Sequence, residues 1–249
     1  MGKSTEDKMS DKRKVTDGID LITEALEVFS VPVAGQDSFF KDKVMVDVGC
    51  GAGHLARELT SRGARVTGID TPEMVKKAQE YTATGDETYQ EGGGECLPLE
   101  NDWADVVIFF ASLHHIEVDK MREALKECYR VLKKNGLAII VEPVIVKGTW
   151  SELAKLLRDE TEIQKQALAT IKSADQIGFM ALKEESFYFE RTLDDFITQL
   201  NDHEADENKR KEYIRAGEKI LADFSSKAHI ATADYRFKSN CRLNILQKK

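Results

Sequence analysis

The feature that most constrains the fold is an apolar strand that runs directly into a glycine-rich turn. The segment Val44–Val48 is apolar apart from Asp47, and Gly49, Gly51 and Gly53 follow it at alternate positions. A near-continuous apolar run of this length is typical of a strand that is buried on both faces, as in a parallel sheet. Glycines after such a strand allow a tight turn and a close approach of the backbone to a ligand, with a helix N-terminus beyond them. The pattern predicts a strand, a ligand-binding turn and a helix in succession.

The following hundred residues repeat the alternation of strand and helix. Helices are expected between the strands because apolar residues recur there at helical spacing. Such an alternation predicts right-handed crossovers and an α/β fold, a Rossmann-like doubly wound, mostly parallel sheet. The predicted strands are Val44–Val48, Arg65–Ile69, Thr88–Gln90, Asp105–Phe110 and Leu137–Val141.

The alternation of strand and helix patterns ends after about Pro143, and we place a predicted domain boundary there. Residues 151–172 have a helical pattern, and Thr192 with Asp195 resembles a capping box at the start of another helix. We predict an N-terminal helical arm at 1–40, a cofactor-binding core at 41–143 and a helical lid or insertion at 144–230. A C-terminal β-hairpin at 231–249, turning at Ser239-Asn240, is expected to complete the sheet with an antiparallel strand.

Composition and charge indicate which kinds of binding partner and which cellular location to expect. The chain has 249 residues, a formal net charge of −8 and no long basic stripe, which disfavours binding to nucleic acid. No apolar run approaches the roughly 20 residues of a membrane span, and the N-terminal residues do not resemble a signal peptide. The four cysteines form no C-x-x-C pair. A cytoplasmic protein with free thiols is expected by elimination, and nothing in the sequence indicates an oligomeric state.

The glycine turn itself favours one kind of ligand. It has the pattern G-x-G-x-G, and His54 stands where a dinucleotide-binding G-x-G-x-x-G needs its last glycine. The carboxylate of Asp47 would repel a pyrophosphate but can pair with an amino group. S-adenosylmethionine carries an α-ammonium and a sulfonium and no phosphate. Asp70, at the end of the next strand, is placed to accept the ribose hydroxyls, and we favour this role over that of a helix cap before Pro72.

These residues lie in a series of motifs that resembles a known family, the class I S-adenosylmethionine-dependent methyltransferases, and within it the methyltransferase-domain group related to the quinone-biosynthesis methyltransferases. The resemblance covers about Val44 to Pro143 and keeps the order of five motifs. They are VDVGCGAG, GID, GGGECLPL, DVVIFFASLHHI and CYRVLKKNGLAIIVEP.

The resemblance implies a role for each matching residue. The cofactor turn comprises Gly49, Cys50, Gly51 and Gly53, with Asp47 toward the methionine end and Asp70 on the ribose. Thr71 and Met74 are expected near the adenine, as are Gly94, Glu95 and Cys96, and Ala111 is expected under the sulfonium. The sequence departs from the family at Gly93, where related chains often have an aspartate that accepts from the adenine amino group. Adenine recognition then rests on backbone groups, on another side chain or on looser binding.

Two histidines follow the fourth predicted strand. His115 is the candidate general base, since histidine titrates near neutrality, while the alternative is that His114 and His115 orient the loop. No metal site is expected, because no partner stands at ligand spacing. Glu142 is expected either to face the acceptor or to be a solvated strand-end carboxylate. Trp150, Tyr188 and Arg191 are candidates for an acceptor pocket, although aromatic residues in a helical cap are more often core.

The sequence therefore predicts a methyltransferase that uses S-adenosylmethionine and acts on a small-molecule acceptor. One alternative is an RNA or protein methyltransferase on the same fold. Another is a non-catalytic cofactor-binding relative, for which Gly93 leaves room. An NAD-dependent oxidoreductase is disfavoured by Asp47 and His54.

Overall fold

The computed structural model describes residues 13–29, 40–147, 149–204 and 206–249. The strands are β1 (Arg13–Lys14), β2 (Val44–Val48), β3 (Arg65–Asp70), β4 (Thr88–Glu91), β5 (Ala104–Phe110), β6 (Leu132–Pro143), β7 (Phe179–Arg191) and β8 (Phe237–Lys248). The α-helices are α1 (Gly18–Phe29), α2 (His54–Ser61), α3 (Pro72–Gln79), α4 (Met121–Val131), α5 (Ser151–Leu157), α6 (Thr161–Lys172), α7 (Leu193–His203) and α8 (Glu207–Ala228). Short 3₁₀ turns are η2 (Leu113–His115), η3 (Ala174–Gln176) and η4 (Thr232–Asp234).

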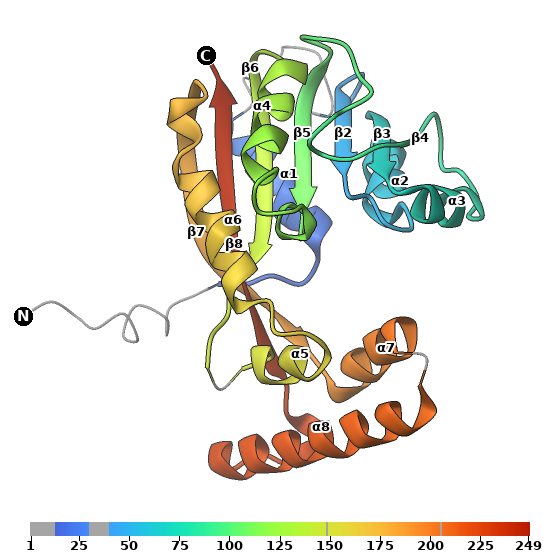
Figure 1. Ribbon diagram of the computed structural model, residues 1–249, viewed down its shortest axis with the longest axis vertical. Coiled ribbons are helices and arrows are strands. Elements are labelled where there is room, and N and C mark those ends of the chain that lie inside the picture. Colours follow the sequence, from blue (N-terminus) through green and yellow to red (C-terminus); the bar gives the residue numbers. More distant parts are fainter. Residues whose placement is uncertain (1–12, 30–39, 148, 205) are drawn as a thin grey trace, which may run out of the picture. The chain divides into compact units, whose positions relative to one another are not determined.

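The described strands form a mixed sheet in the order β1-β7-β8-β6-β5-β2-β3-β4 (Figure 1). Strand β2 pairs in parallel with both β3 and β5, and β3–β4 and β5–β6 are also parallel pairs. The C-terminal strands are antiparallel. This arrangement confirms the predicted Rossmann-like α/β fold. It also brings the carboxyl ends of β2, β3, β4, β5 and β6 to one edge of the sheet.

Helices cover both faces of the parallel part. On one face α4 and α6 contribute Leu125, Cys128 and Ala167 to a core that includes Val107 and Phe109 of β5. Alternation along β5 sends Val106 and Ile108 to the opposite face, where α1 and α2 lie. Because β2 is buried along its whole length, its polar residue Asp47 is enclosed as well.

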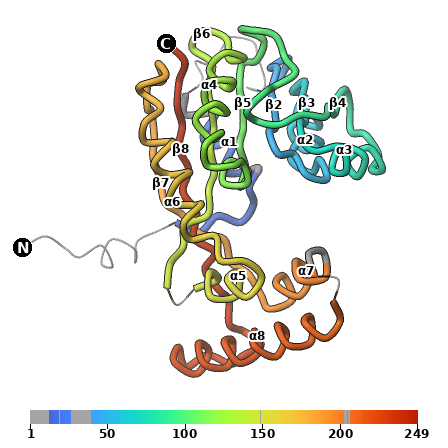
Figure 2. The backbone as a smooth tube through the Cα atoms, viewed as in Figure 1, coloured from blue at the N-terminus to red at the C-terminus, as the bar shows by residue number. Residues whose placement is uncertain are grey.

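The chain divides into two compact units. The first comprises 17–142, 163–185 and 242–249, and contains the parallel strands and the glycine turn. The second comprises residues up to 16, 143–162 and 186–241. Strands β7 and β8, the long orange and red segments of Figure 2, each contribute residues to both units.

The second unit has an aromatic core of its own. Trp150, Phe196 and Phe237 are buried together, and helices α5, α7 and α8 pack around them. The capping box predicted at the start of α7 is confirmed, because the Thr192 side chain accepts from the Asp195 N–H and the Asp195 carboxylate accepts from the Thr192 N–H. Lys14 in β1 forms an ion pair with Glu190 in β7 at 2.6 Å.

The predicted C-terminal hairpin is wrong. Residues 237–248 form the single strand β8, which continues through Ser239 and Asn240. No residue of the strand has the positive φ that a two-residue hairpin turn requires. The Asn240 carbonyl instead accepts a hydrogen bond from the Val144 N–H at 2.8 Å.

Three other boundaries differ from the prediction. Strand β6 begins at Leu132, directly after α4, and passes through Asn135, whose φ of 64° accommodates a register shift between β5 and β6. The predicted insertion at 144–230 is divided, because Ile171 of α6 and Phe179 of β7 pack in the core of the first unit. Within the predicted N-terminal arm, α1 is helical but β1 is a strand paired with β7. The remaining residues of that arm, 1–12 and 30–39, lie outside the described residues.

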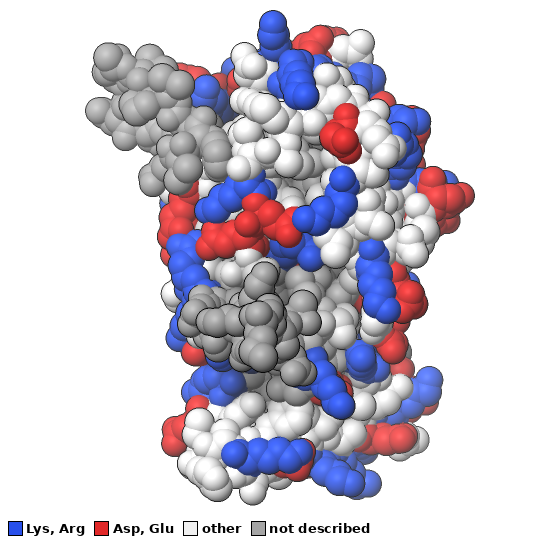
Figure 3. Space-filling view, turned by 90° about the vertical axis from the view of Figure 1, so that its left-hand side faces the viewer, with Lys and Arg blue, Asp and Glu red and all other residues white. Residues whose placement is uncertain are grey.

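Charge is mixed on the surface. On the face shown in Figure 3, Lys and Arg side chains are interspersed with Asp and Glu side chains and do not form a continuous basic stripe. Among the helices that the structure describes, none combines the length and the apolar character that crossing a membrane requires.

Candidate functional site

The glycine turn connects β2 to α2 at the carboxyl edge of the sheet. The Gly49 N–H donates to the Ile69 carbonyl at 2.8 Å, so the turn is held to the neighbouring strand β3. Gly53 caps α2 with a left-handed conformation. All three glycines have positive φ, which L side chains rarely adopt. The predicted strand, turn and helix are confirmed.

The three glycines differ in what lies beside them. A Cβ at Gly49 would lie 2.4 Å from Cβ of Ser112, and one at Gly53 would lie 2.4 Å from the Tyr89 hydroxyl oxygen. A Cβ at Gly51 would meet only Cε of Met74, at 3.7 Å. Gly49 and Gly53 therefore make room for side chains of this chain, and Gly51 faces open space in which a ligand can approach the backbone.

Asp47 is the most unusual polar residue of this edge. Its side chain is 2% exposed, and its Oδ2 has no hydrogen-bond partner among the described residues. Burial, together with the nearby charge of Asp70, raises the pKa of Asp47 to about 7. A buried carboxylate without a donor is costly unless a ligand supplies one. The residues therefore fit a ligand that brings an amino group to this position.

Asp70 lies at the end of β3, where the sequence placed it, and it already accepts two hydrogen bonds. Its Oδ2 accepts from the Gly51 N–H and its Oδ1 from the Thr71 N–H, both at 2.7 Å. Each carboxylate oxygen can accept a second bond, so the arrangement still leaves capacity for ribose hydroxyls. Asp70 therefore ties the glycine turn to β3. The N-cap of α3 is Thr71 and Pro72 occupies its first turn, so Asp70 is not the helix cap that was the alternative role for it.

A second turn begins where β5 ends. Ala111 has a φ of 54°, and its N–H donates to the Val141 carbonyl of β6 at 2.7 Å. The Ser112 hydroxyl donates to the Val48 carbonyl at 2.5 Å, which joins this turn to the end of β2. Ser112 is a site residue that the sequence analysis did not identify, because its partner is 64 positions away.

His114 and Glu142 form a buried pair beneath this turn. Their side chains are 3% and 2% exposed, with Nδ1 of His114 and Oε2 of Glu142 2.5 Å apart. The other carboxylate oxygen, Oε1, accepts from the Leu113 N–H at 3.0 Å. Glu142 is thus neither solvated nor open to an acceptor, which corrects both expectations. It holds η2 in place, the loop-orienting role expected as the alternative for this histidine pair.

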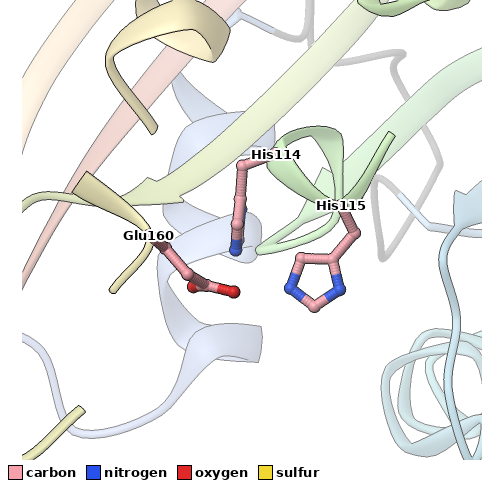
Figure 4. Close-up of side chains that lie close together, drawn as sticks. All are labelled: His114, His115 and Glu160. Atoms are coloured by element: carbon pink, nitrogen blue, oxygen red, sulfur yellow. The ribbon is translucent and has the colours of Figure 1, made fainter. Parts of the chain in front are cut away.

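His115 is exposed at the same turn. Figure 4 shows the two imidazole rings leaving η2; their centroids are 4.3 Å apart and the rings meet edge to face. Glu160, also labelled there, belongs to the second unit. The His115 side chain is exposed, unlike that of His114. Its role as a base stays a prediction.

The segment expected near the adenine forms a tight turn after β4. The Cys96 N–H donates to the Gly93 carbonyl at 3.1 Å, and Gly94 is buried between them. Cys96 is exposed and Glu95 is half-buried. The Cys50 thiol of the glycine turn is buried, and its burial, with Asp47 and Asp70, raises its pKa far above the usual range. Cys50 is therefore a neutral packing residue.

A buried cation lies behind the glycine turn, and the sequence analysis missed it. The Arg57 guanidinium donates to the Ala52 carbonyl at 2.8 Å and lies 4.7 Å from the ring centroid of Tyr81. It also donates to the Tyr89 hydroxyl at 3.3 Å. A signal was available, because Arg57 falls between the buried Ala56 and Leu59 on the inner face of α2. Arg57 links the turn, α3 and β4.

The three candidates for an acceptor pocket all lie in the second unit. Trp150 is buried in its aromatic core, edge to face with Phe196 and Phe237, so the core reading holds for this residue. The Tyr188 ring lies 4.6 Å from Nζ of Lys238, and the Arg191 guanidinium lies 5.7 Å from the Phe189 ring. Tyr188 and Arg191 are partly exposed.

Comparison with known proteins agrees with this geometry. Residues 46–140 match a family model described as a methyltransferase domain. An uncharacterized methyltransferase of Bacillus subtilis, YcgJ, is 27% identical over 56% of this chain and 58% of its own length. A demethylmenaquinone methyltransferase of Chlorobaculum parvum is 28% identical over 59% of this chain and 60% of its own. The chain thus spans about three fifths of the length of these relatives.

Solved structures share the fold. The crystal structure of YcgJ has a TM-score of 0.62 at 20% identity, and covers 93% of this chain and 97% of its own. The [4+2]-cyclase SpnF has a TM-score of 0.55, also at 20% identity, and covers 92% and 81%. The matched segment contains the glycine turn, Asp70 and most of β2 and of β6, and its distant homologues include quinone-biosynthesis methyltransferases. Residues 46–140 therefore match the domain of the class I S-adenosylmethionine-dependent methyltransferases.

Proposed function

We propose that this protein transfers the methyl group of S-adenosylmethionine to a small-molecule acceptor. The observation that carries the cofactor part of the proposal is the buried Asp47 carboxylate, with an Oδ2 that lacks a donor in the described part of the chain. An α-ammonium group would supply that donor and a compensating charge. A pyrophosphate would meet a negative charge there, which argues against NAD.

The remaining residues of the edge supply complementary contacts. Gly51 presents open backbone, Asp70 has spare acceptor capacity for the ribose, and Met74 lies beside Gly51. When bound, S-adenosylmethionine supplies an electrophilic methyl group and a leaving sulfur that keeps the electron pair. The protein then needs chiefly to align the acceptor and exclude water, and His115 is the side chain at η2 that we assign to receive a proton where the acceptor carries one.

The small-molecule acceptor rests on two further observations. The net charge of −8 disfavours a phosphate backbone as substrate. One of the relatives is by its name a demethylmenaquinone methyltransferase, and we carry over to this chain an acceptor that is not a macromolecule.

The rival readings make different predictions. An RNA or protein methyltransferase would label macromolecules, and a non-catalytic relative would bind the cofactor without transfer. The [4+2]-cyclase SpnF shares the fold, so the fold alone leaves the reaction open.

The test is the fate of a tritiated methyl group. The purified protein is incubated with labelled S-adenosylmethionine and, separately, with a deproteinised metabolite extract, total RNA and total protein. We expect label in dialysable, solvent-extractable product of the first reaction only, and weaker transfer by Asp70→Ala at the same cofactor concentration. Label in acid-precipitable RNA or protein would replace the small acceptor by a macromolecular one. Cofactor binding without transfer to any pool would identify a non-catalytic relative.

A further inference from the structure

The turn after β4 contains a carboxylate in an unexpected place. The Gly92 N–H donates to the Asp70 carbonyl at 3.0 Å, so the turn at 93–96 starts directly beside the end of β3. Within the turn the Glu95 side chain folds back over Gly93. A Cβ built on Gly93 would lie 2.5 Å from Oε2 of Glu95 and 3.1 Å from Oε1. The carboxylate therefore occupies the space in which a side chain at position 93 would begin.

This position of the Glu95 carboxylate depends on the glycine at 93. The φ of Gly93 is outside the left-handed region, since the described glycines with positive φ are 49, 51, 53, 63 and 178. The backbone at 93 would thus accept an L side chain without strain. A side chain at position 93 and the observed position of the Glu95 carboxylate are mutually exclusive, because no Cβ can approach an oxygen to 2.5 Å, and a side chain there would move the carboxylate away.

The carboxylate also lacks a donor. No hydrogen bond or ion pair to Glu95 occurs among residues 13–29, 40–147, 149–204 and 206–249, and its side chain is half-buried. The turn that holds it is fixed, because a Cβ on Gly94 would lie 2.7 Å from Cδ1 of Ile116 and 3.3 Å from Cγ1 of Val48. This turn beside Asp70 thus offers a half-exposed carboxylate to which no described residue donates a hydrogen bond, and on which the charge of Lys120 acts.

We infer that Glu95 selects adenine in this chain, its carboxylate accepting a hydrogen bond from the exocyclic amino group of the cofactor. Glu95 would then make the hydrogen bond that an aspartate at position 93 makes in related chains. The glycine at 93 leaves room for the Glu95 carboxylate. The inference rests on the proposed function, because it needs the cofactor to bind at this edge. On this inference, the lack of an acidic residue at position 93 does not argue against adenine recognition, because Glu95 supplies the carboxylate.

Binding, measured by calorimetry, tests the inference without any reaction. The ligands are S-adenosylhomocysteine, its analogue without the 6-amino group, and S-inosylhomocysteine, which has a carbonyl there. A hydrogen bond to a charged group is worth about 10- to 100-fold in affinity. Wild-type protein should prefer the adenine ligand over the 6-deamino ligand by that factor. Glu95→Ala should bind both equally.

Two further variants separate recognition from folding. Gly93→Asp in the Glu95→Ala background should restore the preference, because the alanine vacates the space that the aspartate needs. Glu95→Gln can donate to a carbonyl, so it should bind S-inosylhomocysteine at least about 10-fold more tightly than wild type does. Circular dichroism establishes that each variant is folded.

The outcomes are distinguishable. A wild-type protein that binds S-adenosylhomocysteine with no preference for the amino group, or a folded Glu95→Ala that keeps the full preference, overturns the inference and leaves the proposed function standing. A wild-type protein that binds none of the three ligands overturns both.

Discussion

The Oδ2 atom of Asp70 accepts a hydrogen bond from the Gly51 N–H at 2.7 Å, which joins the end of β3 to the middle of the glycine turn. The same carboxylate receives the Thr71 N–H through Oδ1. One side chain thus positions the glycine that faces open space and holds the N–H of Thr71, the N-cap of α3. On the proposed function, the position of the turn and the binding of the ribose depend on this single residue.

Replacing Asp70 by alanine should therefore weaken cofactor binding. The variant removes the acceptor for two backbone donors and for the ribose, and we expect a loss of roughly 1–3 kcal/mol in binding free energy. Calorimetry with S-adenosylhomocysteine measures this loss. Glu73→Ala, an exposed residue in the first turn of α3, is the matched control and should bind as wild type does. Equal affinity for Asp70→Ala and the control would remove Asp70 from the site.

Cofactor affinity should depend on pH through Asp47. Because burial and then Asp70 raise the pKa of Asp47 to about 7, the unliganded carboxyl is protonated below that pH and charged above it. Only the charged form attracts an ammonium, so affinity for S-adenosylhomocysteine should fall as the pH is lowered from 8 to 6. Near pH 6.5 binding should also release a proton, seen as a dependence of the calorimetric heat on the buffer.

The control for this prediction is Asp47→Asn. Its affinity should be lower at pH 8 and nearly independent of pH between 6 and 8. The unliganded variant should be more stable than wild type at pH 8, because the carboxyl of the folded wild type holds its proton to about pH 7 while that of the unfolded chain loses it near its ordinary pKa of 3.8. Between these values the free energy of unfolding of the wild type falls as pH rises, by at most about 4 kcal/mol in total. Parallel pH dependence in both proteins would exclude Asp47 as the titrating group.

The glycines of the turn should separate into two classes. Gly49→Ala would place a Cβ 2.4 Å from Cβ of Ser112, so it should lower stability by about 2 kcal/mol or more, and part of this loss should be recovered with Ser112→Gly. Gly51→Ala meets only Met74 and should cost about 1–2 kcal/mol for its positive φ, while losing most of its affinity for S-adenosylhomocysteine. Urea unfolding and calorimetry measure the two effects. The assignment fails if Gly51→Ala binds as tightly as wild type.

Glu142 should be important for stability, because it satisfies two buried groups. Glu142→Ala leaves the Leu113 N–H and Nδ1 of His114 without their acceptor, and we expect a loss of about 2–4 kcal/mol in the free energy of unfolding. Glu117→Ala, an exposed carboxylate next to the same turn, is the control and should change stability by less than about 0.5 kcal/mol. Denaturant titration of both variants tests this, and similar values for the two would show that the buried pair contributes nothing.

The sequence predicted correctly those elements of the fold that are specified by residues close together in the chain. The apolar runs of β2 and β5, Pro72 at the start of α3 and the Thr192 capping box each act within a few residues. The C-terminal hairpin failed because Ser239-Asn240 resembles a turn in composition, yet the buried Asn240 carbonyl is bonded to Val144. The sequence around Ser239-Asn240 does not reveal this hydrogen bond, because its donor lies almost a hundred residues earlier in the chain.

In the candidate site, too, residues specified by local sequence could be predicted and contacts between distant residues could not. Asp47, the glycines and Asp70 could be placed from the order of strand, turn and strand. The pair of His114 with Glu142 and the bond from Ser112 to Val48 join residues 28 and 64 positions apart, and only the assembled sheet brings them together. The return of Glu95 over Gly93 depends on one side-chain rotamer in a turn, which no periodicity encodes.

The most direct test of the account is competition for the glycine turn between two cofactors. Calorimetry at pH 8 with S-adenosylhomocysteine and with NADH asks whether the buried Asp47 selects an ammonium over a pyrophosphate. We expect binding of S-adenosylhomocysteine that Asp47→Asn weakens, and no binding of NADH. Binding of NADH without binding of S-adenosylhomocysteine would contradict the account.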